Sequence, residues 1–184
     1  MGRRYVALLR GINVGGRNKV AMADLRDLFE QAGHEAVRTY IQSGNVLFES
    51  DRPARDLAEH LEGELERQLG MSLVVVVRSH QQMRNVVGRA PAGFGRSPEK
   101  YHSDVIFLKE GLTTARAMDV VELRDGVDQV WTGSNVLYFA RLSERRTQSK
   151  LSKIIGTEPY KSMTIRNWNT TTKLVAMLDE QPDE

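Results

Sequence analysis

Hydrophobic residues in the first half of the chain follow two different periods, which together predict six elements. Short apolar or β-branched runs have the length of a strand, whereas apolar residues at every third or fourth position mark one helix face. The expected elements are a strand at 5–9, a helix from Met22 to Ala32, strands at 37–41 and 46–48 joined by a tight turn, a helix carrying Leu57 to Leu69, and a strand at 73–77. Their predicted order is β-α-β-β-α-β.

The second half repeats this order after a connector, which is expected to hold a helix from His80 to Val87 and a loop at 91–100. The expected elements of the second half are a strand at 105–108, a helix at 112–123, a hairpin with strands at 130–131 and 136–139, a helix from a Ser143 cap to Gly156, a strand at 163–165, and a last helix carrying Leu174, Met177 and Leu178. Residue identity supports a duplication, because Ser43-Gly-Asn-Val-Leu-Phe48 returns as Gly133-Ser-Asn-Val-Leu-Tyr138.

These patterns predict an α+β fold, a tandem duplication of two ferredoxin-like (βαββαβ, α/β plait) subdomains. In this arrangement two helices cover one face of a mainly antiparallel four-stranded sheet. We expect a first plait at 1–78, a helical connector and loop at 79–102, and a second plait with a C-terminal helix at 103–184.

Three predicted strands lack the alternation of apolar and polar residues that is typical of a sheet with one solvated face. They are Val6 to Leu9, Leu73 to Val77 and Val105 to Leu108. Continuous apolar runs indicate strands that are buried on both faces. The second face of each sheet is therefore expected to be covered by the other unit or by a second chain, which makes a homodimer one predicted assembly.

The composition excludes several classes of chemistry. The chain has no cysteine, so disulfides, thiolate metal sites, iron–sulfur clusters and cysteine nucleophiles are absent. The four histidines lack the spacing that places two ligands on one helix face, so we expect no metal site, and we expect no cofactor. No apolar stretch is long enough for a membrane span or a signal-peptide core. A cytoplasmic protein without a membrane partner is predicted.

Basic residues are concentrated in two segments, although the net charge is only +2. Residues 1–19 hold five basic side chains and no acid, and residues 141–173 hold eight basic and two acidic side chains. If folding brings the two segments together, they form a face that attracts anions. If it does not, they are solvated cations on separate surfaces.

Three motifs occur together in the chain. They are Arg10-Gly-Ile-Asn-Val-Gly-Gly-Arg-Asn-Lys19, Tyr40-Ile-Gln-Ser-Gly-Asn-Val-Leu-Phe48 and Thr164-Ile-Arg-Asn-Trp-Asn-Thr170. As a set they resemble the bacterial family catalogued as domain of unknown function 1697, and the resemblance runs from end to end. It implies two ferredoxin-like subdomains and no particular activity, catalytic residue or cofactor.

The first motif has the spacing of a phosphate-binding P-loop between a strand and a helix. Arg17 replaces the phosphate-binding lysine and Asn18 replaces the residue that holds magnesium, which argues against nucleotide hydrolysis of the usual kind. A simpler anion site made by main-chain amides and arginines stays possible, and so does a purely structural glycine loop. The candidate ligand-binding residues here are Arg10, Asn13, Gly15, Gly16, Arg17, Asn18 and Lys19.

The third motif begins the last helix and supplies two more candidates. Asn167 or Asn169 is expected to cap the helix, and Arg166 is placed to accompany an anion at its positive end. The alternative is a capped helix with Trp168 in the core and no ligand.

Two further patterns are weak. Tyr101-His-Ser-Asp104 contains the letters of a hydrolase triad, but neighbours in sequence are not expected to converge as a triad must. Gln42 to Phe48 supplies one aromatic residue and no basic residue, so RNA stacking on the sheet face is not expected. Contacts between the basic segments and a nucleic-acid backbone remain a separate hypothesis.

The sequence therefore leaves three functional hypotheses of different classes. The first is a protein that binds a small anionic or phosphate-bearing ligand at the basic glycine-rich loop. The second is an enzyme that acts on a nucleotide or phosphorylated substrate, with arginines as electrostatic stabilisers and no identified base. The third is a dimeric or protein–protein interaction scaffold.

Overall fold

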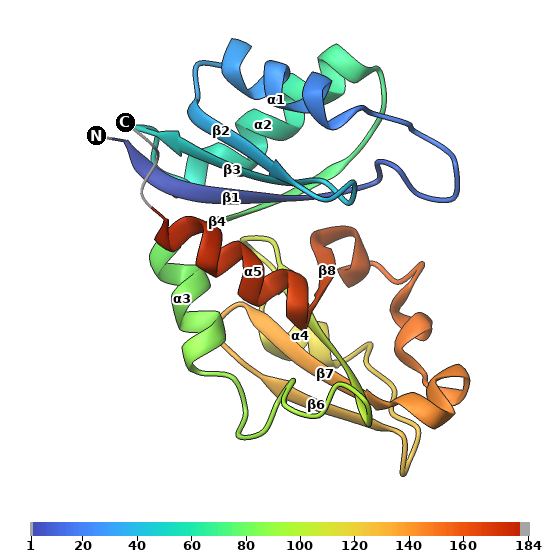
Figure 1. The fold of residues 1–184 in the computed structure, drawn as a ribbon. Helices are drawn as coiled ribbons and strands as arrows, with labels where there is room; N and C mark the ends of the chain where they lie inside the picture. The colour runs from blue at the N-terminus through green and yellow to red at the C-terminus, as the bar shows by residue number, and fades with distance from the viewer. Residues whose placement is uncertain (1, 181–184) are drawn as a thin grey trace. The chain divides into compact units, whose positions relative to one another are not determined.

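A computed structural model describes residues 2–180 of the chain. The chain divides into two compact units, each built around one sheet (Figure 1). The first unit holds the residues up to Met83 together with the segment from Leu174 onward, and the second unit is Arg84–Lys173. This division assigns the end of the last helix to the first unit, whereas the sequence analysis places that whole helix with the second plait.

The first unit contains an antiparallel sheet with two helices on one side of it (Figure 1). Its elements are β1 (Arg3–Arg10), α1 (Met22–Gln31), β2 (Glu35–Tyr40), β3 (Asn45–Ser50), α2 (Ala54–Leu69) and β4 (Val74–Ser79). The strand order is β2-β3-β1-β4, and every neighbouring pair is antiparallel. The predicted β-α-β-β-α-β order is confirmed for this unit.

Both faces of the first sheet are buried, as the missing alternation in its strands predicted. Leu25 and Phe29 of α1 and Leu57 of α2 pack against one face. On the other face, Val6 and Leu8 of β1 are fully buried as well. The sequence analysis predicts a homodimer as one way to cover this face. The face is already buried within one chain, so its burial does not require a second copy. The homodimer itself stays a prediction.

Two arginines bind the C-terminal end of the last helix, α5 (Trp168–Asp179), to the first unit. Arg4 Nη1 donates to the Leu178 carbonyl at 2.5 Å, and Arg38 donates to the Met177 carbonyl. These carbonyls belong to the last turn, whose acceptors have no partner within the helix. The arginines therefore supply hydrogen-bond donors to the helix end, and their positive charges interact favourably with the negative end of the helix dipole.

The second unit contains a sheet of the same strand order. Its elements are the end of α3 (His80–Gly88), β5 (Tyr101–Leu108), α4 (Thr114–Met118), β6 (Asp128–Thr132), β7 (Val136–Leu142), three 3₁₀ segments η1 (Ser143–Gln148), η2 (Leu151–Ile154) and η3 (Pro159–Ser162), β8 (Met163–Asn167) and the start of α5. The order is β6-β7-β5-β8, with antiparallel neighbours throughout. Two antiparallel four-stranded sheets with helices are thus present, as predicted.

Two predicted helices of the second unit were wrong in length or type. The helix expected at 112–123 is limited to α4, and the helix expected from Ser143 to Gly156 is replaced by η1 and η2. The Asp128 carboxylate bonds next to the first of these segments and within the second. Its Oδ2 accepts the backbone N–H of Arg124 at 2.8 Å and of Lys150 at 2.9 Å, which ties both regions to the start of β6.

An Asp128→Ala variant is expected to lose about 2 kcal/mol of its free energy of unfolding, because two backbone amides lose their acceptor. Urea denaturation followed by circular dichroism measures the change. Asp125→Ala is the matched control, since Asp125 is exposed on the same loop. Equal stability of the two variants would show that the Asp128 carboxylate does not hold these segments.

The second face of the β6-β7-β5-β8 sheet is covered from within the second unit. The Tyr138 hydroxyl donates to the Val86 carbonyl of α3 at 2.6 Å. The ring of Phe94, from the segment before β5, lies 5.3 Å from the Tyr138 ring and 5.1 Å from the Trp168 ring. The connector and the first turn of α5 therefore close this face.

Candidate functional site

The glycine-rich loop of the first unit is a tight hairpin. Gly15 and Gly16 both have left-handed φ angles, 57° and 74°, and the Arg17 amide donates to the Val14 carbonyl at 3.0 Å. Two successive residues with positive φ define a type I′ turn, the conformation for which glycine is preferred. The next pair continues the hairpin, with the Asn13 amide donating to the Asn18 carbonyl at 3.0 Å.

Asn13 and Asn18 hold the base of this hairpin with their side chains. Asn13 Oδ1 accepts the Val20 amide at 2.8 Å, and Asn13 Nδ2 donates to the Gln42 carbonyl at 3.0 Å. Asn18 Nδ2 donates to the Gly11 carbonyl at 2.8 Å. Both asparagines also have positive φ, 54° and 50°, which asparagine tolerates better than most residues. Their side chains are occupied by the loop itself.

The hairpin differs from a P-loop in how its backbone N–H groups are used. Two of its amides, those of Asn13 and Arg17, are used inside the turn, so the loop does not present a continuous row of N–H groups. The side chains of Arg17 and Lys19 are exposed, and Arg10 at the end of β1 is half-buried. The loop displays cations on a protruding surface.

The second unit contains a cavity of about 140 Å³ at the N-terminus of α5, which we call the α5 cavity. It lies where β5 extends beyond β8, because the pairing of these strands begins only at Asp104 with Asn167. The α5 cavity is lined by Gly95, Pro98, Tyr101, His102, Ser103, Asn167, Trp168 and Asn169. No aspartate or glutamate belongs to this lining.

Asn167 caps α5, which confirms one of the two predicted caps. Its Oδ1 accepts the Thr170 amide at 2.8 Å, and its carbonyl accepts the Thr171 hydroxyl at 2.9 Å. The positive end of the helix dipole therefore faces the α5 cavity. Arg166, the other candidate of this motif, is buried and does not line the cavity.

The Arg166 guanidinium is held inside the sheet. Its Nη1 donates to the Thr164 hydroxyl and to the Ile165 carbonyl, both at 2.9 Å. Burial lowers the pKa of Arg166 to about 10, which still leaves the side chain charged at neutral pH. The guanidinium stabilises β8 and adds positive charge to the interior of the second unit. Its predicted role as a ligand contact stays a prediction.

Ser103 lies at the buried side of the α5 cavity. It is only 7% exposed, and its hydroxyl has no hydrogen-bond partner in the described part of the chain. The strand register continues from the pair of Asp104 and Asn167 to place Ser103 opposite Trp168. The rim residues Pro98, Asn167 and Asn169 are exposed, so the cavity has a wet rim and a buried floor.

His102 and Asp104 form a pair on the other face of β5. His102 Nε2 lies 3.3 Å from Asp104 Oδ1, and Arg141 Nη2 donates to Asp104 Oδ2 at 3.0 Å. Burial raises the pKa of the Asp104 carboxyl, and the positive charges of Arg141 and His102 oppose that rise. Ser103 projects to the opposite face of the strand, so the three residues do not form a triad.

Most of the chain matches one described protein family. The description "protein of unknown function (DUF1697)" matches residues 2–138. The chain belongs to the DUF1697 family. This confirms the resemblance inferred from the three motifs. A search of curated proteins gave no match.

The DUF1697 chain is also similar to a solved structure, that of the conserved bacterial protein SP0830 from Streptococcus pneumoniae. The two share 30% sequence identity with a TM-score of 0.82, and the match covers 97% of this chain and 100% of that chain. Because the match extends over both units, it supports the whole architecture and not only one sheet.

Among the residues that line the α5 cavity, only Asn167 was predicted as a ligand contact in this DUF1697 protein. Tyr101, His102 and Ser103 belong to the pattern that was set aside as a hydrolase triad, and Gly95 and Pro98 come from a connector without a recognised motif. One local signal was present, since residues two apart on a strand share a face, which predicts that His102 and Asp104 meet. Among the described residues no group of three or more acidic or histidine side chains is arranged to hold a metal ion. No helix in residues 2–180 is long and apolar enough to cross a membrane.

Proposed function

We propose that this DUF1697 protein binds a small anionic molecule, carrying a phosphate or a carboxylate, in the α5 cavity. One observation carries the proposal, namely the buried Ser103 hydroxyl that borders the cavity without a partner among the described residues. A buried hydroxyl that makes no hydrogen bond costs about 1–3 kcal/mol. A ligand oxygen in the cavity supplies the missing partner.

The electrostatics of the α5 cavity support an anion. α5 has 12 residues, and its capped N-terminus borders the cavity. Such a terminus is equivalent to about half a positive charge and offers first-turn N–H groups to a ligand. His102 belongs to the lining, and the nearby Asp104 carboxylate is already paired with Arg141.

The basic loop of the first unit provides a different kind of anion contact. We propose that Arg17 and Lys19 act as exposed cations rather than as a phosphate cradle, and that the half-buried Arg10 adds positive charge at the loop base. Their exposure and the absence of an acid in residues 1–19 support this role. Contact of these cations with a nucleic-acid backbone belongs to the same proposal, and its affinity would fall steeply with salt.

An enzyme acting on a phosphorylated substrate is the second candidate, and the His102–Asp104 pair favours it. A carboxylate on one ring nitrogen fixes the orientation of a histidine, which is the usual arrangement for a general base. His102 is one of the residues that line the α5 cavity, whereas Asp104 is not. Product formation from a bound ligand, lost in His102→Gln, distinguishes this candidate from binding alone.

We also propose that each unit is a ferredoxin-like subdomain and that the two arose by duplication. The two sheets support this proposal because they have equivalent strand orders, β2-β3-β1-β4 and β6-β7-β5-β8. The repeated Asn-Val-Leu segment lies at the start of the equivalent strands: Asn45 is the first residue of β3, and Asn135 directly precedes β7.

Ser103→Ala is expected to weaken binding of inorganic phosphate about ten-fold, because a hydrogen bond to a charged group is lost. Isothermal titration calorimetry of wild type and variant measures the affinity. Ser50→Ala is the matched control, since Ser50 is also 7% exposed on a strand but lies in the first unit.

Three results would contradict the proposal in different ways. Wild type that binds neither phosphate nor acetate would remove the site. Equal affinities for Ser103→Ala and wild type would remove the role of the hydroxyl. A loss in Arg17→Ala that matches the loss in Ser103→Ala would move the ligand from the α5 cavity to the loop.

A further inference from the structure

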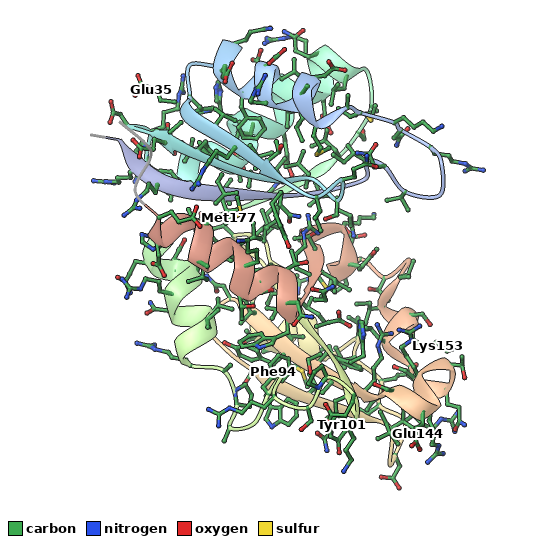
Figure 2. All side chains as sticks on the ribbon, in the orientation of Figure 1. Glu35, Phe94, Tyr101, Glu144, Lys153 and Met177 are labelled. Atoms are coloured by element: carbon green, nitrogen blue, oxygen red, sulfur yellow. The ribbon has the colours of Figure 1, made fainter. Side chains whose placement is uncertain are left out.

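The α5 cavity carries two aromatic side chains in addition to its polar groups. Tyr101 and Trp168 line it together with Ser103. Tyr101 and Phe94 are labelled in Figure 2, and both belong to the second unit. Aromatic rings offer a flat apolar surface on which a planar ligand group stacks.

The indole of Trp168 is fixed by its neighbours. The Phe94 ring meets it edge-on at 5.1 Å with an interplanar angle of 89°. On another side the backbone of Gly95 lies against the indole so closely that a Cβ there would overlap Cδ1 and Nε1. A ring held in place before binding loses little freedom when a ligand arrives, which favours affinity.

The number of polar residues around the cavity favours a phosphate over a carboxylate as the anionic group of the ligand. The lining includes Ser103, His102, Asn169 and the residues that begin α5. A phosphate monoester presents three terminal oxygens to such a set, and a carboxylate presents two. The absence of an acidic side chain from the lining suits the higher negative charge of the phosphate.

The size of the cavity leaves room beside a phosphate. A single water needs about 10–15 Å³ of such space. The α5 cavity has about 140 Å³, so it holds the equivalent of several waters. A phosphate at the first turn of α5 displaces only part of them. Because Tyr101 and Trp168 also line the cavity, the remaining space suits a second, flat group.

We infer that the ligand of the α5 cavity is a phosphate monoester joined to a planar ring, the chemistry of a nucleoside monophosphate. The phosphate binds at the first turn of α5 beside Ser103, and the ring stacks on Tyr101 or Trp168. This inference rests on the proposed function and adds the class of the ligand to it. Stacking of a base on one aromatic side chain strengthens binding about 5- to 150-fold.

A protein with one tryptophan tests the inference directly. The chain has two tryptophans, so Trp131→Phe leaves Trp168 as the sole indole fluorophore, at the cavity. Adenosine 5′-monophosphate, cytidine 5′-monophosphate, ribose 5-phosphate, adenosine and inorganic phosphate are titrated against this variant. Calorimetry with the wild-type protein repeats each titration without the substitution.

The nucleoside monophosphates are expected to bind at least ten-fold more tightly than ribose 5-phosphate or inorganic phosphate, with a change in Trp168 emission. If the ring stacks on Tyr101, Tyr101→Ala is expected to reduce this preference at least five-fold while leaving the affinity for inorganic phosphate unchanged. If it stacks on Trp168, calorimetry is expected to show the same change in Trp168→Leu. Equal affinity for nucleoside monophosphate, ribose 5-phosphate and inorganic phosphate would overturn the ring contact and leave the anion site standing. Adenosine binding as tightly as its monophosphate would overturn the phosphate contact. Wild type that binds none of the five would overturn both the inference and the proposed function.

Discussion

Gly95→Ala is expected to lower the free energy of unfolding by about 3 kcal/mol, because the new Cβ atom both strains the backbone and overlaps a neighbouring side chain. Gly95 has a φ of +72°, which an alanine adopts at a cost of about 1 kcal/mol. The new Cβ would also overlap the indole of Trp168, and overpacking of a filled site costs about 1–3 kcal/mol more. Relief of the overlap requires Trp168 to leave its place in the α5 cavity.

Gly93→Ala separates these two costs. Gly93 has a φ of +80° in the same connector, but a Cβ there would meet no atom within 4 Å. Guanidinium denaturation should therefore show a loss of about 1 kcal/mol for Gly93→Ala, which is the backbone cost alone. Calorimetry should show phosphate affinity preserved in Gly93→Ala and reduced in Gly95→Ala. Two variants of equal stability and equal affinity would refute the proposed contact between Gly95 and Trp168.

The elements that sequence analysis predicted correctly are those whose pattern is decided locally. α2 follows from the four-residue spacing of its leucines and ends at Gly70, whose φ of 66° is left-handed. β1 and β4 follow from apolar runs, because both faces of these strands are buried. In each case the residues that specify the element lie inside it or directly beside it.

The helix wrongly predicted at 143–156 lies in a segment with a hydrogen-bond partner distant in sequence. Nothing in the sequence of 143–156 shows that the Lys150 backbone amide donates a hydrogen bond to the carboxylate of Asp128, which lies 22 positions earlier. Helical spacing of Leu151 and Ile154 correctly marks them as buried, yet the backbone around them is 3₁₀. Apolar spacing indicates which side chains face the core, but it does not by itself distinguish an α-helix from 3₁₀ turns.

The same distinction applies to the candidate site. Asn167 was predicted because a cap bonds to an amide only three residues away. Ser103 could not be predicted, because its importance lies in the absence of a partner, which depends on every element around it. Asn13 and Asn18 were predicted as ligand contacts because they belong to a motif with P-loop-like spacing, and the structure shows their side chains bonded within the loop. Their role as ligand contacts stays a prediction.

His34 is expected to make the first unit unstable in mild acid. It is 4% exposed, neither ring nitrogen has a hydrogen-bond partner in the described residues, and its ring centroid lies 4.8 Å from that of Phe48. Burial, with smaller contributions from His60 and Arg52, lowers the pKa of His34 to about 4. The folded state therefore favours the neutral ring, and protonation of the ring favours unfolding.

The sign of this pH dependence follows from the two pKa values of His34. The pKa is 6.5 in the unfolded chain and about 4 in the folded protein, so the contribution of His34 to stability is complete above about pH 6.5 and is lost as the pH falls toward 4. The loss amounts to about 3 kcal/mol, because each pKa unit corresponds to about 1.4 kcal/mol. Urea denaturation at pH 7.5 and at pH 4.5 should show a much smaller difference in His34→Leu than in wild type. His60→Gln is the control and should retain most of the wild-type difference, since His60 is only half-buried. An unchanged pH dependence in His34→Leu would assign the acid sensitivity to other groups and would show that His34 is hydrated in the folded state.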